Sequence, residues 1–271
     1  MNLVKVFGIT TFTLVVGGVA IYVYKEISGI LPPTIEQSPP YITPNEMQAL
    51  QEKNLEKQKM GTWPFISDED DAKAIVSDNL LSKNYYVMVD GSGSMRVSRC
   101  SGNLSKMDAA KNALVAFGES IPAGANLGLS TFDKNGVREI MPLQQFNKNT
   151  FDQQVKSIEE GGGTPLKTSI TDAYKQLTAQ AKKQLGYGEY NLVIVTDGQA
   201  SSNEDPTRIV ETVTAESPVI IHTIGFCIGS DHALNKPGKV LYNQADNTAE
   251  LEKGLQSVTA ESEAFIITDF K

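Results

Sequence analysis

The chain has 271 residues, a formal net charge of −8 and a sequence pI near 4.9. An acidic chain lacks the basic face that binding to a nucleic-acid backbone requires, so this class of function is excluded. With 40% hydrophobic residues, the chain can bury one sizeable core plus smaller pieces. Its two cysteines, Cys100 and Cys227, are in neither CxxC nor Cys/His spacing, which argues against a structural zinc site.

Residues 6–24 form an uncharged, mostly apolar segment that follows Lys5. A helix over this segment would reach about 28 Å, close to the hydrocarbon thickness of a bilayer. Residues 18–20 (Gly-Val-Ala) also match a signal-peptide cleavage pattern, and cleavage remains an alternative. Because apolar residues continue past that site, the pattern favours a retained transmembrane anchor over residues 1–28. The positive charge of Lys5 and the amino terminus predicts a cytoplasmic N-terminus, with the bulk of the chain outside the cytoplasm.

Residues 29–65 differ in composition, with proline pairs at 32–33 and 39–40. Paired prolines favour an extended, semi-rigid chain that cannot enter a sheet. Thr43 and Glu46 form a capping box that predicts the start of a short polar helix. This segment is therefore interpreted as a Pro-rich stalk, and residues 66–271 as the globular domain.

Within the globular domain, apolar runs alternate with apolar residues at helical spacing. In chain order, the patterns predict a strand at 84–89, a helix at 106–120, strands at 127–132 and 137–141, a short helix over 151–158, a helix at 165–183, a strand at 192–195, a helix at 206–215, strands at 219–226 and 240–242, and a helix at 248–259. Such alternation predicts an α/β fold, with a doubly wound, mostly parallel sheet covered by helices on both faces. His222, inside an apolar run, is expected to be a buried strand residue rather than a base.

In parallel sheets, ligands bind beyond the carboxyl ends of the strands. Three polar segments are expected there: Asp90-Gly91-Ser92-Gly93-Ser94 after the first strand, Gly161-Gly162-Gly163-Thr164 after the short helix, and Thr196-Asp197-Gly198 after the central strand. They supply carboxylates, hydroxyls and glycines that let the backbone turn closely around a small ion. Oxygen donors without cysteine or histidine favour Mg²⁺, Mn²⁺ or Ca²⁺ over zinc or copper.

On these three segments, residues 82–260 resemble the von Willebrand factor A (vWA) family, whose fold integrin inserted domains and many bacterial surface proteins share. The family's Asp-x-Ser-x-Ser motif is complete, and its threonine and second aspartate also have counterparts here. The resemblance implies a metal-ion-dependent adhesion site (MIDAS). Its metal residues would be Asp90, Ser92, Ser94, Thr164 and Asp197. The three hydroxyls would coordinate the cation directly, and the two aspartates mostly through water.

The resemblance further implies divalent-cation-dependent protein binding. Neutral ligands leave the charge of the cation, Mg²⁺ (or Mn²⁺/Ca²⁺), partly unquenched, so that it can accept an Asp or Glu carboxylate from a protein partner. Residues 225–229 and 242–246 resemble bacterial members of the family. They imply a bacterial inner-membrane protein with a periplasmic vWA domain, and cell adhesion is one use of such a domain.

Two other function classes compete with this interpretation. The chain could be a scaffold subunit of a membrane complex, in which the metal serves a fixed interface. It could also be a metal-dependent hydrolase, but the sequence shows no general base and no second metal site. Nucleotide binding is not expected, because Leu166 stands where a Walker A loop requires glycine. We therefore expect a binding protein and not an enzyme.

Cys100 lies in an insert over residues 97–104, and Cys227 follows a predicted strand. Both are expected on the metal-bearing rim, and a disulfide between them is our hypothesis for a domain outside the cytoplasm. Two unpaired thiols are the alternative. The nearby Arg96, Arg99 and Lys106 are expected to form a solvated basic fringe that helps an acidic ligand approach.

Overall fold

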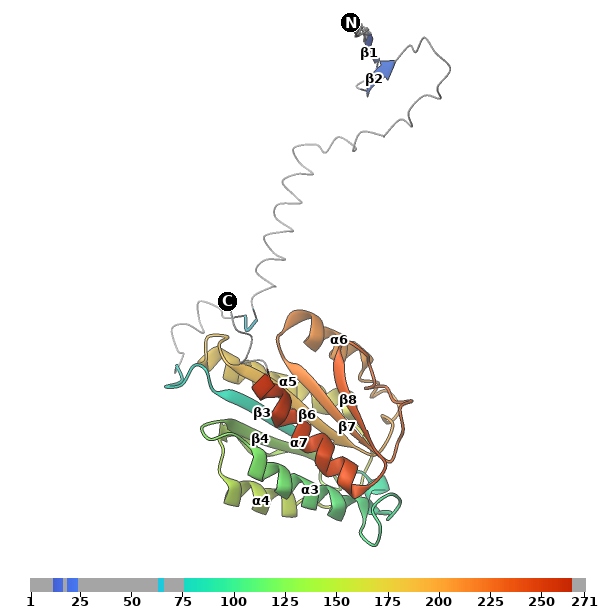
Figure 1. The fold of residues 1–271 in the computed structure, drawn as a ribbon. Coiled ribbons are helices and arrows are strands. Elements are labelled where there is room, and N and C mark those ends of the chain that lie inside the picture. The colour runs from blue at the N-terminus through green and yellow to red at the C-terminus, as the bar shows by residue number, and fades with distance from the viewer. Residues whose placement is uncertain (1–11, 17–18, 24–62, 66–75, 265–271) are drawn as a thin grey trace, which may run out of the picture. The chain divides into compact units, whose positions relative to one another are not determined.

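The computed structural model describes residues 12–16, 19–23, 63–65 and 76–264 (Figure 1). The chain divides into two compact units, Met1–Glu52 and Lys53–Lys271. In the first unit, β1 (Phe12–Val16) and β2 (Val19–Val23) pair antiparallel.

These two strands lie where the sequence predicts a membrane helix over residues 6–24, so the structure does not show that helix. Valine, isoleucine and threonine are frequent in this segment and favour strands. Within the part of the chain that the structure describes, no helix is both long and apolar enough to cross a bilayer. The predicted polar helix of the stalk lies outside the described residues.

The second unit contains a six-stranded sheet in the order β5-β4-β3-β6-β7-β8. The strands are β3 (Lys83–Asp90), β4 (Asn126–Asp133), β5 (Gly136–Gln145), β6 (Glu189–Thr196), β7 (Ile220–Phe226) and β8 (Val240–Ala245). All neighbours run parallel except β4 and β5, which form an antiparallel hairpin. The mostly parallel α/β sheet is therefore confirmed. Strand β5 is longer than predicted and includes Pro142, which an edge strand tolerates.

Helices cover both faces of this sheet, and each face has its own hydrophobic core. The helices α3 (Lys106–Ser120), α4 (Lys148–Lys156) and α7 (Thr248–Ala264) cover the face seen in Figure 1, and α5 (Leu166–Lys183) and α6 (Thr207–Glu216) cover the other. Successive residues of β3 alternate between the two cores, with Val87 in one and Met88 in the other. Burial on both faces explains why the central strands are continuous apolar runs. Trp63, from the predicted stalk, packs its ring against Tyr174 and Tyr190.

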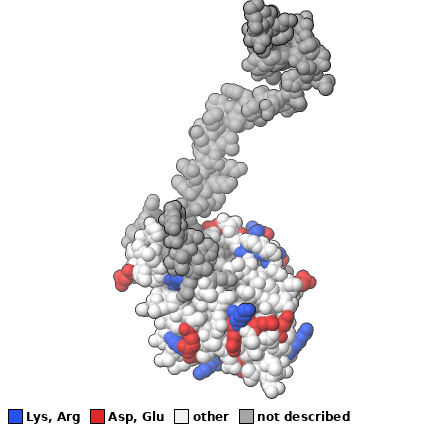
Figure 2. Space-filling view, viewed as in Figure 1, with Lys and Arg blue, Asp and Glu red and all other residues white. Residues whose placement is uncertain are grey.

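Strand register brings the ends of three neighbouring strands to one edge of the sheet. In the pairing of β3 with β6, Val89 lies opposite Val195, and in the pairing with β4, Asp90 lies opposite Phe132. The loops that follow β3, β4 and β6 therefore emerge side by side. On the face seen in Figure 2, acidic and basic side chains of the described residues are interspersed rather than gathered into one patch. Surface charge on this face therefore does not mark a site.

His222 provides a test of the fold through the pH dependence of its stability. The residue is 2% exposed in β7, and its Nε2 lies 3.0 Å from Asn191 Oδ1, as expected of a buried strand residue. Burial lowers its pKa from 6.5 to about 4. The unfolded chain therefore binds a proton at His222 more readily than the folded protein does. As the pH falls below the pKa of His222 in the unfolded chain, the unfolding free energy decreases. The decrease reaches about 3 kcal/mol near pH 4.

We expect His222→Gln, which keeps a donor for Asn191 without titrating, to remove this pH dependence. Urea unfolding of both proteins between about pH 4 and pH 7.5 measures it. Relative to the variant, the wild type should lose about 3 kcal/mol of unfolding free energy over this range. A difference between the two proteins that stays constant with pH would contradict the burial of a neutral His222.

Candidate metal centre

Asp90 ends strand β3 and is fully buried. Its Oδ1 accepts a hydrogen bond of 2.8 Å from the backbone N–H of Ser92, and its Oδ2 accepts one of 2.6 Å from the hydroxyl of Thr196. Burial raises the pKa of Asp90 from 3.8 to about 6, although these hydrogen bonds work in the opposite direction. The neighbouring carboxylate of Asp197 raises this pKa further. Among the described residues, no salt bridge joins Asp90 to a lysine or arginine. The carboxylate is thus buried with neutral partners, an arrangement that a bound cation would stabilise.

The two serines of the motif lie in the turn that follows. Residues Gly93–Arg96 form one turn of 3₁₀ helix, which was not predicted, and Ser92 precedes it. The hydroxyl oxygens of Ser92 and Ser94 are 2.9 Å apart. The hydroxyl of Ser94 donates a hydrogen bond of 2.7 Å to Oδ1 of Asp197, which directly follows β6. Two hydroxyls and one carboxylate oxygen therefore form a continuous cluster.

The loop that carries Thr164 is hydrogen-bonded directly to the loop after β3. The backbone N–H of Gly161 donates to the carbonyl of Gly91 at 2.7 Å, and that of Gly93 donates to the carbonyl of Gly162 at 3.2 Å. Gly162 has a φ of +82°, and a Cβ there would lie 3.0 Å from the Asp133 carbonyl oxygen. The positive φ and the close approach of this loop to the end of β4 therefore explain a glycine at this position.

Thr164 is held in place through its backbone. Its N–H donates to Ser201 Oγ at 2.8 Å, and its carbonyl accepts from the N–H of Ser201 at 3.0 Å. Its side chain faces Gly198, where an added Cβ would lie 3.9 Å from Thr164 Oγ1 and 3.7 Å from Ser94 Oγ. Gly198 therefore leaves a space between these two hydroxyls.

The structure brings all five predicted site residues to this one edge of the sheet. They offer three hydroxyls and two carboxylates, which are hard oxygen donors suited to Mg²⁺, Mn²⁺ or Ca²⁺. In the described part of the chain, no three or more His, Cys, Asp or Glu residues form a group that could hold a metal ion. A cation here would therefore depend on the serine and threonine hydroxyls as well as the two aspartates. The donors fit a small divalent cation.

Comparison with known proteins identifies the family. The von Willebrand factor type A domain matches residues 84–271, which is more than half of the chain. This chain belongs to the vWA family. The family match covers all five residues of the candidate metal centre.

Individual relatives extend this result. Uncharacterized protein YwmC of Bacillus subtilis (strain 168) is 26% identical over 191 residues, which cover 63% of this chain and 80% of that protein. A vWA structure from Catenulispora acidiphila superposes with a TM-score of 0.53 at 20% identity, over 67% of this chain and 43% of that one. Proximal thread matrix protein 1 from the mussel byssus, with a zinc-occupied MIDAS motif, gives 0.54 at 17% identity, over 66% of this chain and 47% of that one. This chain thus spans less than half of either structure, and at these identities the likeness establishes the fold.

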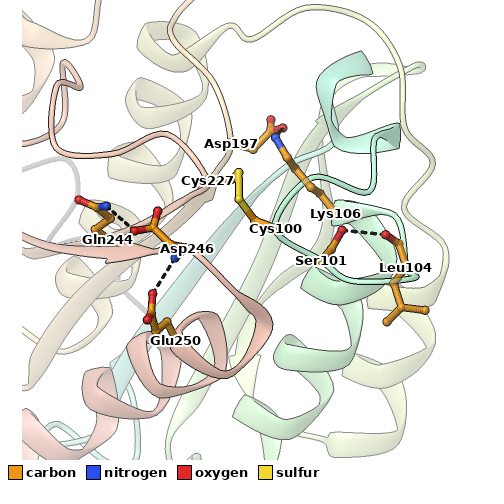
Figure 3. The surroundings of a disulfide bond; sticks show 9 residues. All are labelled: Cys100, Ser101, Leu104, Lys106, Asp197, Cys227, Gln244, Asp246 and Glu250. Atoms are coloured by element: carbon orange, nitrogen blue, oxygen red, sulfur yellow. Dashed lines mark hydrogen bonds and ion pairs between the residues drawn. A yellow bond between two sulfur atoms is a disulfide. The ribbon is translucent and has the colours of Figure 1, made fainter.

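The vWA domain has three residues at this site whose roles were not predicted from the sequence: Lys106, Thr196 and Ser201. Lys106 was expected in a solvated fringe, but it is 5% exposed, and its Nζ lies 2.7 Å from Asp197 Oδ2 (Figure 3). The expectation was wrong because α3 begins at Lys106 and directs its side chain inward to the carboxylate. Thr196 and Ser201, which hold Asp90 and Thr164, were also missed as contacts. For Thr196, its position directly before Asp197 was a signal in the sequence. For Ser201 there was no such signal.

The predicted disulfide of the vWA domain is present between Cys100 and Cys227, whose Cα atoms are 5.9 Å apart. It joins the insert after the metal motif to the loop after β7, beside the Lys106–Asp197 pair (Figure 3). The insert is also closed by a hydrogen bond of 2.9 Å from the N–H of Lys106 to the carbonyl of Val97. The disulfide therefore restrains one wall of the candidate metal centre.

His232, which lies in the same connection between β7 and β8 as Cys227, contacts the vWA metal centre at Gly198. Its Nε2 is 2.8 Å from the carbonyl oxygen of Gly198, and its Nδ1 accepts a hydrogen bond of 3.1 Å from the N–H of Leu234. The acceptor role of Nδ1 assigns the proton to Nε2, which donates to Gly198. Burial lowers the pKa of His232. A neutral histidine thus fixes the turn that directly follows Asp197.

Proposed function

We propose that this chain is a membrane-anchored vWA protein that binds partner proteins through a divalent cation held by Asp90, Ser92, Ser94, Thr164 and Asp197. The observation that carries the proposal is the cluster formed by the hydroxyls of Ser92 and Ser94 with Oδ1 of Asp197. Thr164 Oγ1 and Ser94 Oγ both face the position of Gly198. The fully buried carboxylate of Asp90 supports it, because no lysine or arginine of the described residues forms a salt bridge with Asp90. We assign Mg²⁺ as the cation, with Mn²⁺ or Ca²⁺ as alternatives on the same ligand chemistry.

A centre of this kind acts by binding a partner, and this function requires no catalytic group. Three of its five ligand side chains are neutral, so a bound cation keeps part of its charge. It can then take an Asp or Glu carboxylate of a partner protein in a charge-assisted contact. The relative with the zinc-occupied MIDAS motif supports a divalent ion at such a site.

The same proposal places the vWA domain in the periplasm of a bacterium, with the apolar segment at residues 6–24 as its inner-membrane anchor. The Cys100–Cys227 disulfide supports this location, because disulfides persist in oxidising compartments. The B. subtilis relative is consistent with a bacterial source. The apolar segment itself is the sequence argument for the anchor.

Ser92→Ala tests the function directly, because it deletes one proposed ligand hydroxyl from a buried position. We expect the Mg²⁺ affinity of the full-length protein, measured by isothermal titration calorimetry, to fall on the order of 10- to 100-fold. Ser98→Ala in the exposed insert is the matched control and should leave the affinity unchanged. Crosslinking of partners in membranes should decrease in EDTA and in Ser92→Ala, but not in Ser98→Ala.

Equal crosslinking in Mg²⁺ and in EDTA, with equal binding by Ser92→Ala, would contradict metal-dependent binding while leaving the vWA fold intact. Partners that co-purify stoichiometrically and resist EDTA would instead favour the fixed scaffold of a membrane complex.

A further inference from the structure

Lys106 is a buried cation inside the candidate metal centre. Its side chain is 6% exposed and that of its partner Asp197 is fully buried, with Nζ and Oδ2 2.7 Å apart (Figure 3). Lys106 is also the first residue of α3, where the positive end of the helix dipole disfavours a cation. A lysine buried in this position requires a negative partner, which Asp197 supplies. The pair therefore ties the start of α3 to the metal centre.

The two carboxylate oxygens of Asp197 have different partners. Oδ1 accepts the hydroxyl of Ser94 at 2.7 Å, and Oδ2 accepts the ammonium of Lys106. Lys106 thus engages the oxygen that does not contact the serine cluster. Asp197 turns only Oδ1 toward the proposed ligands.

Lys106 also changes the charge of the site. Asp90 and Asp197 together contribute two negative charges when ionised, and Lys106 returns one positive charge. The three side chains therefore sum to one negative charge, and a divalent cation converts that sum to one positive charge. Without Lys106, the same loaded site would be neutral.

We propose that Lys106 sets this charge, so that the centre binds the cation alone weakly and binds it more tightly together with an anionic ligand. The inference rests on the proposed function and adds that cation and carboxylate bind cooperatively. Because binding linkage is reciprocal, a bound carboxylate raises the affinity for the cation by the same factor as a bound cation raises the affinity for the carboxylate. The positive charge of Lys106 repels the cation and attracts the carboxylate. Lys106 is thus a positioning and charge-setting residue and not a metal ligand.

Lys106→Met, which has a neutral side chain of similar length, is the first test. We expect its full-length form to bind Mg²⁺ at least about 10-fold more tightly than the wild type, because a like charge beside the cation is removed. Acetate is the carboxylate probe, and water-proton relaxation of the Mn²⁺-loaded protein reports its binding. Acetate should bind the Lys106→Met variant at least about 10-fold more weakly than the wild type. Lys106→Arg retains the charge and should restore both affinities to within about 3-fold of the wild type.

A second pair of variants keeps the test valid if Lys106→Met fails to fold with Asp197 unpaired. Asp197→Asn alone leaves the Lys106 charge in place, whereas the double variant Lys106→Met/Asp197→Asn removes both buried charges. We expect the double variant to bind Mg²⁺ at least about 10-fold more tightly than Asp197→Asn. Equal Mg²⁺ affinities in this pair, or an unchanged affinity in folded Lys106→Met, would overturn the inference and leave Lys106 a purely structural residue. Failure of the wild type itself to bind Mg²⁺ would instead overturn the proposed function.

Discussion

A Cys100→Ala/Cys227→Ala double variant is expected to lose about 4–5 kcal/mol of unfolding free energy, the upper part of the range for native disulfides. The two cysteines are separated by 127 residues in the sequence, so the disulfide closes a long loop. In the chain-entropy account, such a loop restricts the unfolded chain strongly, and the cost of releasing it grows slowly with loop length. Urea unfolding of the oxidised wild type and the variant measures the difference.

Reduced wild-type protein is the control for this prediction. It should unfold at the same urea concentration as the double variant, because both lack the crosslink and keep the rest of the sequence. If oxidised wild type and variant differ by less than about 1 kcal/mol, the disulfide either does not form in solution or closes a loop that other contacts already restrain. Mass spectrometry of alkylated, unreduced protein separates these two results, since free thiols are alkylated and disulfide sulfurs are not.

Asp90→Asn is expected to have opposite effects on metal binding and on the stability of the metal-free protein. The asparagine keeps an oxygen for the N–H of Ser92 and an amide for Thr196 Oγ1, but it removes the charge. We expect Mg²⁺ affinity to fall on the order of 100-fold. In the same variant, the unfolding free energy without metal should rise by up to about 3 kcal/mol near pH 8.

The sign of the stability change follows from the pKa of Asp90. Burial raises that pKa to about 6, so the folded protein binds the proton more tightly than the unfolded chain. The wild type therefore has its full unfolding free energy when the pH is below the pKa that Asp90 has in the unfolded chain. It loses part of that free energy as the pH rises through the pKa of Asp90 in the folded protein. The gain from Asp90→Asn should therefore be near zero at about pH 3.5 and complete near pH 8. Urea unfolding curves of both proteins in EDTA at these two pH values test the predicted gain. If the variant is less stable than the wild type near pH 8, the buried charge of Asp90 does not destabilise the metal-free protein.

Most of the fold was predictable because a parallel sheet buried on both faces leaves clear patterns in sequence. The run at residues 192–195 is apolar at every position, since β6 contacts a core on each side. Helix α3 has the predicted bounds, and Leu114 and Phe117 on its predicted apolar face are fully buried. The N-terminal segment was predicted as a membrane helix, although its β-branched residues also favour strands. There the structure has β1 and β2.

The sequence by itself determined which side chains gather at the candidate metal centre. Each predicted site residue ends a strand, directly follows one or lies in a glycine-rich turn. The direction of the chain at these places brings it to the carboxyl edge of the sheet. The disulfide was also predictable as a hypothesis, since both cysteines were expected on that rim. Local pattern and topology sufficed for these features.

Only the tertiary structure decided which charged and polar side chains surround the proposed metal ligands. Lys106 lies 91 residues from Asp197 in the sequence, and Thr196 lies 106 residues from Asp90. No local pattern separates a buried lysine from a solvated one, because burial depends on what packs against the side chain after folding. The pairing of Ser201 with Thr164 likewise depends on two loops that meet only in the folded domain. The ligands of the proposed cation are therefore encoded locally, whereas the charge around it is set by long-range packing.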